Sequence, residues 1–219
     1  IYLLFLACFQ FSNGMYFTAM GQMEGALPIT LNGIKMLGHA VLIGLTMYFT
    51  LAFRLKFRFT NRTCLMTAAA VLFICNLLVP HVRSFPLLLL ICFIAGFFRL
   101  FGTFECLSNI RLWISPKQDF GVFLPTIYII ILAAMPASNW AAQQLMIAFG
   151  SWEAMHWFMV ALMLTIILVI YTCTHDWRFM KPLPLVSLDW LGCILWSALM
   201  LEIIWLFTYG EYYNWWDGA

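Results

Sequence analysis

Charged residues are scarce in this chain. Only 9% of its 219 residues are Asp, Glu, Lys or Arg, whereas an ordinary soluble domain has about 25%. Nine acids and eleven bases are too few to cover a water-soluble surface, and a net charge of +2 argues against a nucleic-acid-binding protein. Disordered chains are charged and poor in aromatic residues, but 18% of this chain is aromatic. The composition therefore leaves a membrane protein as the class to examine.

The chain also lacks the patterns of common catalytic and metal sites. Its seven cysteines are scattered and odd in number, so they do not predict a disulfide framework. The sequence shows no cluster of His, Cys and Asp with metal-ligand spacing. It shows no nucleophile elbow, phosphate-binding loop or paired-histidine motif either. We therefore predict that the protein is not an enzyme and needs no cofactor or metal.

Apolar sequence is what the chain has in abundance, at 64% of its residues. Seven apolar segments are separated by short polar breaks, and a membrane-spanning helix needs about 20 such residues. The segments cover residues 1–20, 32–53, 63–80, 86–108, 120–148, 154–174 and 188–209. Apolar residues occur on all sides of each segment, as helices embedded in lipid require. The sequence predicts an all-α polytopic membrane protein.

Basic residues lie mainly in alternate breaks. The breaks after the second, fourth and sixth segments hold eight of them, namely Arg54, Lys56, Arg58, Arg62, Arg111, Lys117, Arg178 and Lys181. The other breaks hold only Lys35 and Arg83. Because base-rich loops face the cytoplasm, we predict a protein of the cell membrane with a cytoplasmic N-terminus. The aromatic tail 210–219 would then lie outside.

Ionisable residues within the apolar segments are the main functional candidates, since such groups are costly in lipid and usually face a cavity or a partner. Arg99 and Glu105 lie in the fourth segment and Glu202 in the seventh. We interpret Arg99 as a coupling or cavity charge. For all three, a structural ion pair or a head group that reaches the membrane surface is the alternative. Glu24, just after the first segment, is either a proton-loading carboxyl or a solvated loop acid.

Neutral residues within the segments form two further groups. Asn13, Asn139 and Gln143 either line a polar path or form hydrogen bonds between helices. In the fifth segment, small residues recur every four positions around Pro136 in two adjacent rows. One row is Ala133, Ala137 and Ala141, and the other is Ala134, Ser138 and Ala142. Small residues permit close helix contact, and proline permits a bend. The pattern indicates either a moving helix contact or plain tight packing.

Several motifs follow one another in a recognisable order. They are Gly25-Ala26-Leu27-Pro28, the cytoplasmic loop motif with Arg54, Lys56 and Arg58, Arg99 after Gly96-Phe97-Phe98, Pro136 among alanines, Trp152 to Phe158, and Asp189-Trp190-Leu191-Gly192. Together they resemble the first half of a major facilitator superfamily transporter, in particular the fourteen-span drug–proton antiporter branch. Phe53 and Lys56 stand where the loop motif of that branch has an acid and a glycine. Ala19 stands where the branch has an aspartate, and Glu24 is the nearest substitute.

The resemblance implies an organisation and a function. It implies an N-terminal six-helix major-facilitator bundle at 1–174, a cytoplasmic linker at 175–187, an additional transmembrane helix at 188–209 and a truncated tail. The implied function is proton-coupled efflux of amphipathic or drug-like small molecules by alternating access. The implied partners are the lipid bilayer, the substrate, protons, the missing C-terminal half of the chain and, in some members, a periplasmic adaptor.

One alternative stays open at this point. The chain begins at Ile1 without an initiator methionine or a signal peptide, and we expect it to be a fragment of a longer protein. Seven apolar segments would also suit a seven-span receptor or another signalling or structural membrane protein. A cytoplasmic N-terminus and short breaks favour the transporter.

Overall fold

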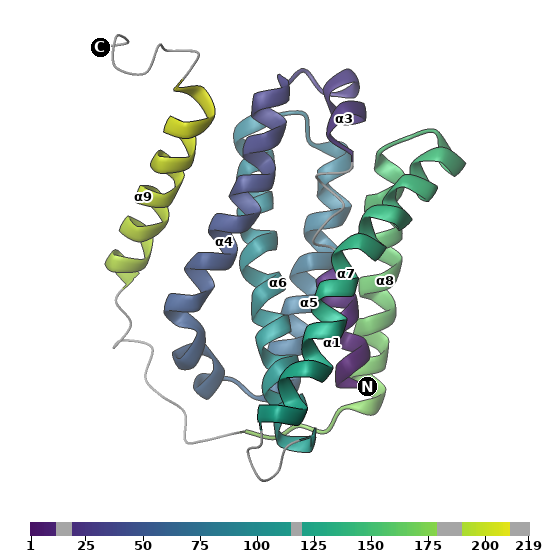
Figure 1. Ribbon diagram of the computed structural model, residues 1–219, viewed down its shortest axis with the longest axis vertical. Coiled ribbons are helices and arrows are strands. Elements are labelled where there is room, and N and C mark those ends of the chain that lie inside the picture. Colours follow the sequence, from purple (N-terminus) through teal and green to yellow (C-terminus); the bar gives the residue numbers. More distant parts are fainter. Residues whose placement is uncertain (12–18, 115–119, 179–189, 211–219) are drawn as a thin grey trace.

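The computed structural model describes residues 1–11, 19–114, 120–178 and 190–210. Within these ranges every regular element is a helix (Figure 1). The helices are α1 (Tyr2–Phe11), α3 (Met20–Ala26), α4 (Leu31–Arg58), α5 (Asn61–Leu78), the short 3-10 helix η1 (Val79–His81), α6 (Phe85–Ile114), α7 (Phe120–Phe149), α8 (Glu153–Cys173) and α9 (Trp190–Tyr209).

Five of the described helices are long and apolar enough to cross a membrane. They cover Asn61–His81, Phe85–Leu112, Phe123–Phe149, Glu153–Cys173 and Trp190–Tyr209. This confirms the prediction of an all-helical chain with apolar helices of membrane-spanning length. Helix α4 has 28 residues but is more polar, with Lys35 near its start and Lys56 and Arg58 in its last turn.

The first predicted segment, residues 1–20, is described only in part. Helix α1 has 10 residues and α3 has 7. Residues 12–18, including Asn13, lie outside the described residues. The described part therefore does not show one continuous helix over 1–20.

Local chemistry explains where several helices begin and end. The side chain of Thr30 accepts a hydrogen bond from the backbone N–H of Gly33 at 3.3 Å, and Thr60 accepts one from Thr63 at 3.4 Å. These threonines cap the N-termini of α4 and α5 by satisfying backbone donors that have no partner within the helix. Gly150 follows α7 with a φ of 66°, a conformation that glycine adopts without steric cost. The chain can therefore reverse at once into α8.

Helix α6 lies at the centre of the bundle. It packs against α1, α4 and α5, while α5 also packs on α8 and α7 on α1. Figure 1 shows α9 at the edge of the bundle beside α4, and α4 is the helix on which α9 packs. Helix α7 also contacts α6, so side chains of α6 have neighbours on four helices.

Helices α4 and α6 approach each other backbone to backbone. A Cβ atom on Gly44 would collide with the carbonyl oxygen of Phe93, and one on Gly96 would collide with that of Val41. Small residues allow such close contact between membrane helices, where van der Waals packing replaces the hydrophobic effect as the source of affinity. The two glycines thus fix the distance between α4 and α6.

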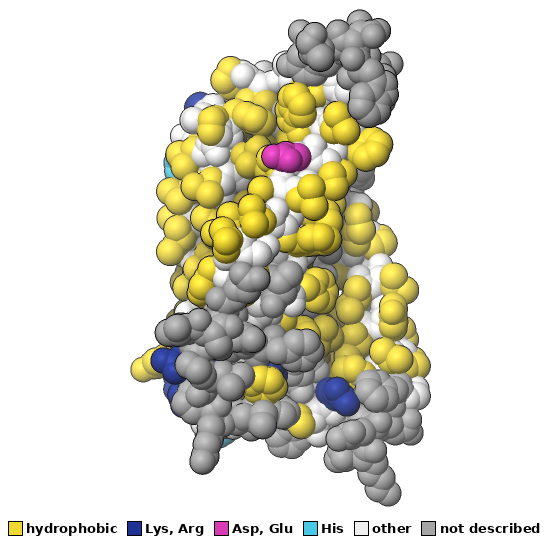
Figure 2. All heavy atoms as spheres, turned by 90° about the vertical axis from the view of Figure 1, so that its left-hand side faces the viewer, with side chains coloured by type: hydrophobic (Ala, Val, Ile, Leu, Met, Phe, Trp, Pro, Cys, Tyr) yellow, Lys and Arg dark blue, Asp and Glu magenta, His cyan; other side chains and the backbone are white. Residues whose placement is uncertain are grey.

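Most of the described basic residues gather at one end of the bundle, whereas Lys35 and Arg83 lie toward the other. Lys56 and Arg58 lie in the last turn of α4, and Arg111 lies in the last turn of α6. Arg62 lies in the first turn of α5. Figure 2 shows Lys and Arg side chains near the lower end of the molecule, which is the end where α4 finishes in Figure 1. We call this the basic end.

Candidate functional site

A buried ion pair joins α4 and α6 at the basic end. The Nζ atom of Lys56 lies 3.2 Å from Oε2 of Glu105, and the two side chains are only 7% and 5% exposed. The ammonium group also lies 5.9 Å from the ring centre of Phe104. Burying a charge without a partner is strongly unfavourable. Each member of this pair therefore provides the counter-charge that allows the other to be buried.

Two asparagines complete the surroundings of the carboxylate. Asn109, one helical turn after Glu105, donates from Nδ2 to Oε1 of Glu105 at 3.1 Å and to its backbone oxygen at 2.7 Å. The side-chain amides of Asn61 and Asn109 lie 2.7 Å apart. The amide of Asn61 also lies 3.0 Å from Oε1 of Glu105. Both carboxylate oxygens of Glu105 thus face polar groups.

Tyr2 and Trp177 close the group from outside α4, α5 and α6. The hydroxyl of Tyr2 lies 2.8 Å from the amide of Asn61, and the indole Nε1 of Trp177 lies 3.1 Å from it. The backbone carbonyl of Trp177 accepts a hydrogen bond from the backbone N–H of Asn61 at 3.0 Å. We call Tyr2, Lys56, Asn61, Glu105, Asn109 and Trp177 the polar cluster. It ties five separate segments of the chain together.

The segment around the end of α8 is held to α5 at a second place. A guanidinium nitrogen of Arg62 donates to the backbone oxygen of Tyr171 at 2.7 Å. The same guanidinium lies 5.1 Å from the ring centre of Tyr171, a typical cation–π distance. The start of α5 is therefore attached to the end of α8 both at Asn61 and at Arg62.

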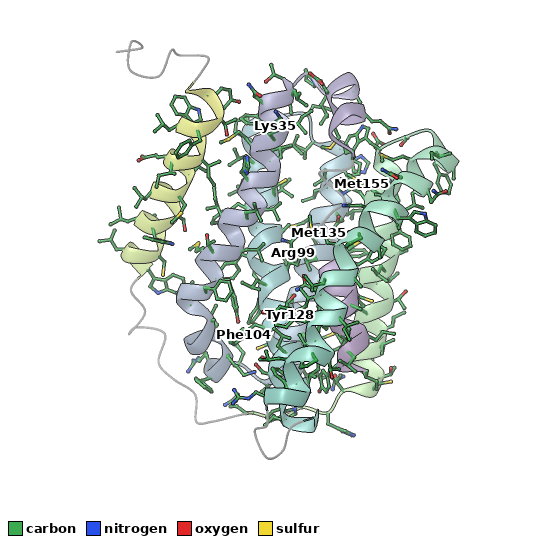
Figure 3. The ribbon with its side chains drawn as sticks, in the orientation of Figure 1. Lys35, Arg99, Phe104, Tyr128, Met135 and Met155 are labelled. Atoms are coloured by element: carbon green, nitrogen blue, oxygen red, sulfur yellow. The ribbon has the colours of Figure 1, made fainter. Side chains whose placement is uncertain are left out.

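Arg99 occupies a different depth from the polar cluster. It is 5% exposed and lies six residues before Glu105 in α6, which is about 9 Å along the helix axis. Figure 3 shows Arg99 near mid-height of the bundle, with Phe104 closer to the basic end. Below it, Gln10 of α1 donates to the hydroxyl of Thr103 at 3.3 Å. The structure thus places one buried cation in the middle of α6.

The remaining ionisable candidates do not join the polar cluster. Glu24 is exposed in α3, at the end of the bundle opposite the basic end (Figure 1). Glu202 is exposed on α9. Asn139 is half-buried and Gln143 is exposed, both in α7. The sequence named these side chains as separate candidates beside Arg99 and Glu105. Together the six residues lie on four helices, α3, α6, α7 and α9.

Helix α7 packs through one of its two predicted rows of small residues. Ala134, Ser138 and Ala142 are buried, and α7 packs against α1. The other row is turned outward, because Ala133 and Ala137 are exposed and Ala141 is half-buried, and Pro136 beside it is exposed as well. The helix continues through Pro136. The Ala133 row is therefore available on the surface of the described bundle.

Sequence reasoning missed most of the polar cluster. Asn61 and Asn109 were not singled out, although an amide four residues after a carboxylate in an apolar helix is a signal for a local hydrogen bond. It also missed a smaller buried pair toward the opposite end, where Nδ1 of His156 lies 3.1 Å from Oδ1 of Asn76. That pair joins α8 to α5.

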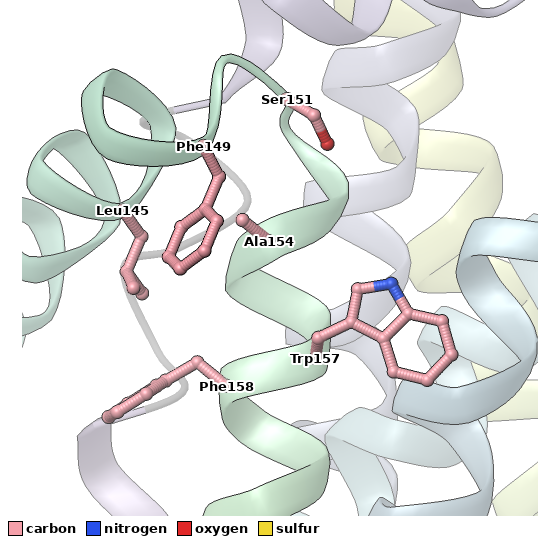
Figure 4. A pocket seen from close by; sticks show the side chains of 6 residues that line it. All are labelled: Leu145, Phe149, Ser151, Ala154, Trp157 and Phe158. Carbon is pink, nitrogen blue, oxygen red and sulfur yellow. The ribbon is translucent and has the colours of Figure 1, made fainter.

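An apolar pocket lies where α7 turns into α8. It has a volume of about 540 Å³ and is lined by Leu145, Phe149, Ser151, Ala154, Trp157 and Phe158 (Figure 4). Ser151 is its one hydroxyl-bearing side chain. Such a lining suits a hydrocarbon group rather than a charged ligand.

Among the described residues, no group of three or more His, Cys, Asp or Glu side chains lies close enough together to hold a metal ion. Comparison of the chain with protein-family models and with curated proteins finds no match.

Proposed function

We propose that this chain is the N-terminal half of a major facilitator superfamily secondary transporter, which exports amphipathic or drug-like small molecules in exchange for protons. The observation that carries the proposal is Arg99, a cation buried at mid-depth in the central helix α6. A charged residue within a membrane helix is costly and is retained where it serves a substrate or ion path. In such transporters the site lies near the midplane between two halves.

The distribution of bases supports the orientation that goes with this function. Lys56, Arg58, Arg62 and Arg111 lie at the basic end, while Lys35 lies near the start of α4 at the opposite end. By the positive-inside rule, the basic end and the N-terminus face the cytoplasm of the cell. The buried polar cluster then lies at the cytoplasmic end of the bundle and Arg99 lies deeper in the membrane.

The exposed small residues on α7 favour the presence of a second half that packs against this helix. Ala133, Pro136 and Ala137 are exposed on a helix of membrane-spanning length. Small residues suit close contact with another membrane helix. We assign this row to the contact with the C-terminal half, and the space between the halves to the substrate. Rocking of the halves would open that space to each side in turn.

Transport by the full-length protein in liposomes tests the proposal. An imposed pH gradient should drive movement of a fluorescent amphipathic cation against its concentration gradient, and a proton-sensitive dye should report proton flow in the opposite direction. Collapse of the gradient with an ionophore should stop the accumulation. Equal dye movement with and without the gradient would contradict proton coupling, and movement no faster than in protein-free liposomes would contradict transport.

A further inference from the structure

The amide of Asn61 can face the polar cluster in two orientations. In the first, its Nδ2 donates to the hydroxyl of Tyr2 at 2.8 Å and its Oδ1 accepts from Nδ2 of Asn109 at 2.7 Å. In the second, the two amide atoms are exchanged. Nδ2 then donates to Oε1 of Glu105 at 3.0 Å, and Oδ1 accepts from the hydroxyl of Tyr2 at 2.8 Å and from Nε1 of Trp177 at 3.1 Å. The hydroxyl of Tyr2 can donate or accept, so it suits both orientations.

Neither orientation of Asn61 satisfies every buried polar group around it. The first gives Nδ2 of Asn109 an acceptor but turns an NH₂ group toward Nε1 of Trp177, which can only donate. The second gives Trp177 an acceptor but places the NH₂ groups of the two asparagines 2.7 Å apart. A change of charge next to the amide can therefore decide between the two arrangements.

The charge of Glu105 is in the position to make this decision. An ionised carboxylate only accepts hydrogen bonds, so it favours the second orientation, in which the NH₂ group of Asn61 points at Oε1. A protonated carboxyl group can donate from Oε1. It favours the first orientation, in which Oδ1 of Asn61 takes the same place 3.0 Å away. Protonation of Glu105 thus withdraws the acceptor from Trp177.

Lys56 is the buried cation that favours the ionised form of Glu105. The titratable groups that act on Glu105 or border the polar cluster come from the elements packed around it, and they are Tyr2 of α1, Tyr48 of α4, Cys64 of α5, Cys106 of α6 and, after α8, His175 and Asp176. Helix α7 has Tyr128 as its one titratable residue, and that side chain is exposed. The arginines of the basic end are exposed or half-buried, and they are Arg58, Arg62 and Arg111.

A small cavity beside the ion pair links it to the aqueous phase at the basic end. The cavity has a volume of about 10 Å³ and is lined by Lys56, Phe59, Asn61, Glu105 and Trp177, which leaves room for about one water molecule. Phe59 directly follows α4 and is 37% exposed, so the cavity lies near the rim of the bundle. Movement of Trp177 away from the cavity would admit more water, which can solvate the ammonium group of Lys56 once Glu105 is neutral.

We propose that Glu105 is a proton-binding site whose occupancy decides whether the segment after α8 stays docked on the bundle. A hydronium ion at the basic end gives its proton to Oε1 and leaves as water, so one O–H bond breaks and another forms. The neutral carboxyl group donates to Asn61, the amide turns, and Trp177 is released from it. Loss of the proton reverses each step. The basic end thereby responds to the pH of the aqueous phase that it faces.

Hydroxyl-radical labelling of Trp177 tests the proposal in the full-length protein in nanodiscs. Mass spectrometry measures the labelling relative to the exposed Tyr171 in the last turn of α8. From about pH 8 to about pH 4, a range that spans carboxyl titration, wild-type labelling should rise severalfold. Glu105→Gln, which has the shape of the protonated form, should show the high value at both ends of this range. The matched control Glu153→Gln changes the exposed carboxyl group that pairs with Arg83 and should behave as the wild type.

Two further variants separate the role of the amide from a general loss of stability. Lys56→Met combined with Glu105→Gln leaves no buried charge alone, and Trp177 labelling should again be high at both ends of the pH range. Asn61→Leu keeps a side chain of similar size but has no amide. Its labelling should be high and independent of pH, and adding Glu105→Gln to it should change nothing further.

Three results would overturn the proposal. Wild-type labelling of Trp177 could stay constant over the whole pH range. Glu105→Gln could label like the wild type at the higher pH. A pH response could also persist in Glu105→Gln or Asn61→Leu, which would assign it to another group such as His175. None of these readouts needs transport, so failure of the proposed function and failure of this proposal are distinguishable.

Discussion

Lys56 and Glu105 are 49 residues apart in the chain, and their charged groups lie 3.2 Å apart in a buried contact between α4 and α6. The same two helices meet backbone to backbone at Gly44 and Gly96. One contact is polar and lies at the basic end, and the other is apolar and lies within the bundle. Together they hold α4 in place against the helix that carries Arg99.

Removing one partner of the ion pair should destabilise the protein strongly. We expect Glu105→Leu to lower the free energy of unfolding by about 3–5 kcal/mol, because Lys56 would remain buried without a counter-charge. The double variant Lys56→Met with Glu105→Leu should recover much of this loss, since no charge then remains unpaired. Unfolding of the purified protein in detergent measures both. If the double variant lost as much stability as Glu105→Leu and Lys56→Met alone added together, the two groups would not interact.

The glycine contact between α4 and α6 should not tolerate a side chain. Gly44→Ala and Gly96→Ala each place a Cβ atom against backbone of the other helix, and we expect a loss of stability of about 1–3 kcal/mol for each. Gly25→Ala in α3 is the matched control, because a Cβ atom there meets nothing within 4 Å. Thermal unfolding compares the three variants. Equal melting temperatures for Gly25→Ala and Gly96→Ala would contradict the close approach.

Asn61 should hold the segment after α8 against α5. Asn61→Ala removes the amide that lies close to Tyr2, Glu105 and Trp177, and leaving such buried groups unsatisfied costs about 1–3 kcal/mol. We therefore expect faster hydrogen exchange at residues 174–178, measured by mass spectrometry. Thr67→Ala is the control, because Thr67 is exposed and its hydroxyl donates to the backbone of its own helix. Unchanged exchange in Asn61→Ala would remove the role given to this side chain.

The helices were predictable from the sequence because lipid imposes a simple rule on composition. Two predicted segments agree with the observed helices to within one residue at each end. Segment 120–148 corresponds to α7 at Phe120–Phe149, and segment 154–174 corresponds to α8 at Glu153–Cys173. The end of α4 was less predictable. Its apolar run ends at residue 53, but the helix continues to Arg58. Lys56, interpreted as a loop residue, therefore lies on a helix and is buried.

The polar cluster was not predictable for a different reason. Its contacts join residues that are far apart in the chain, such as Asn61 and Asn109, which are 48 positions apart. A local pattern shows that a polar residue lies in an apolar segment, but the burial of that residue is decided by which helices pack together. Arg99 was identified as an intramembrane charge because a single helix suffices to place it there.

Proton-coupled efflux by the full-length protein in liposomes tests whether Arg99 serves as the coupling charge. The compared variants are Arg99→Ala and the control Lys35→Ala, an exposed base near the start of α4. Both should reach the membrane in normal amounts. We predict that Arg99→Ala loses gradient-driven efflux down to the level of protein-free liposomes, whereas Lys35→Ala keeps the wild-type rate. Wild-type efflux by Arg99→Ala at the same protein level would contradict a coupling role for Arg99.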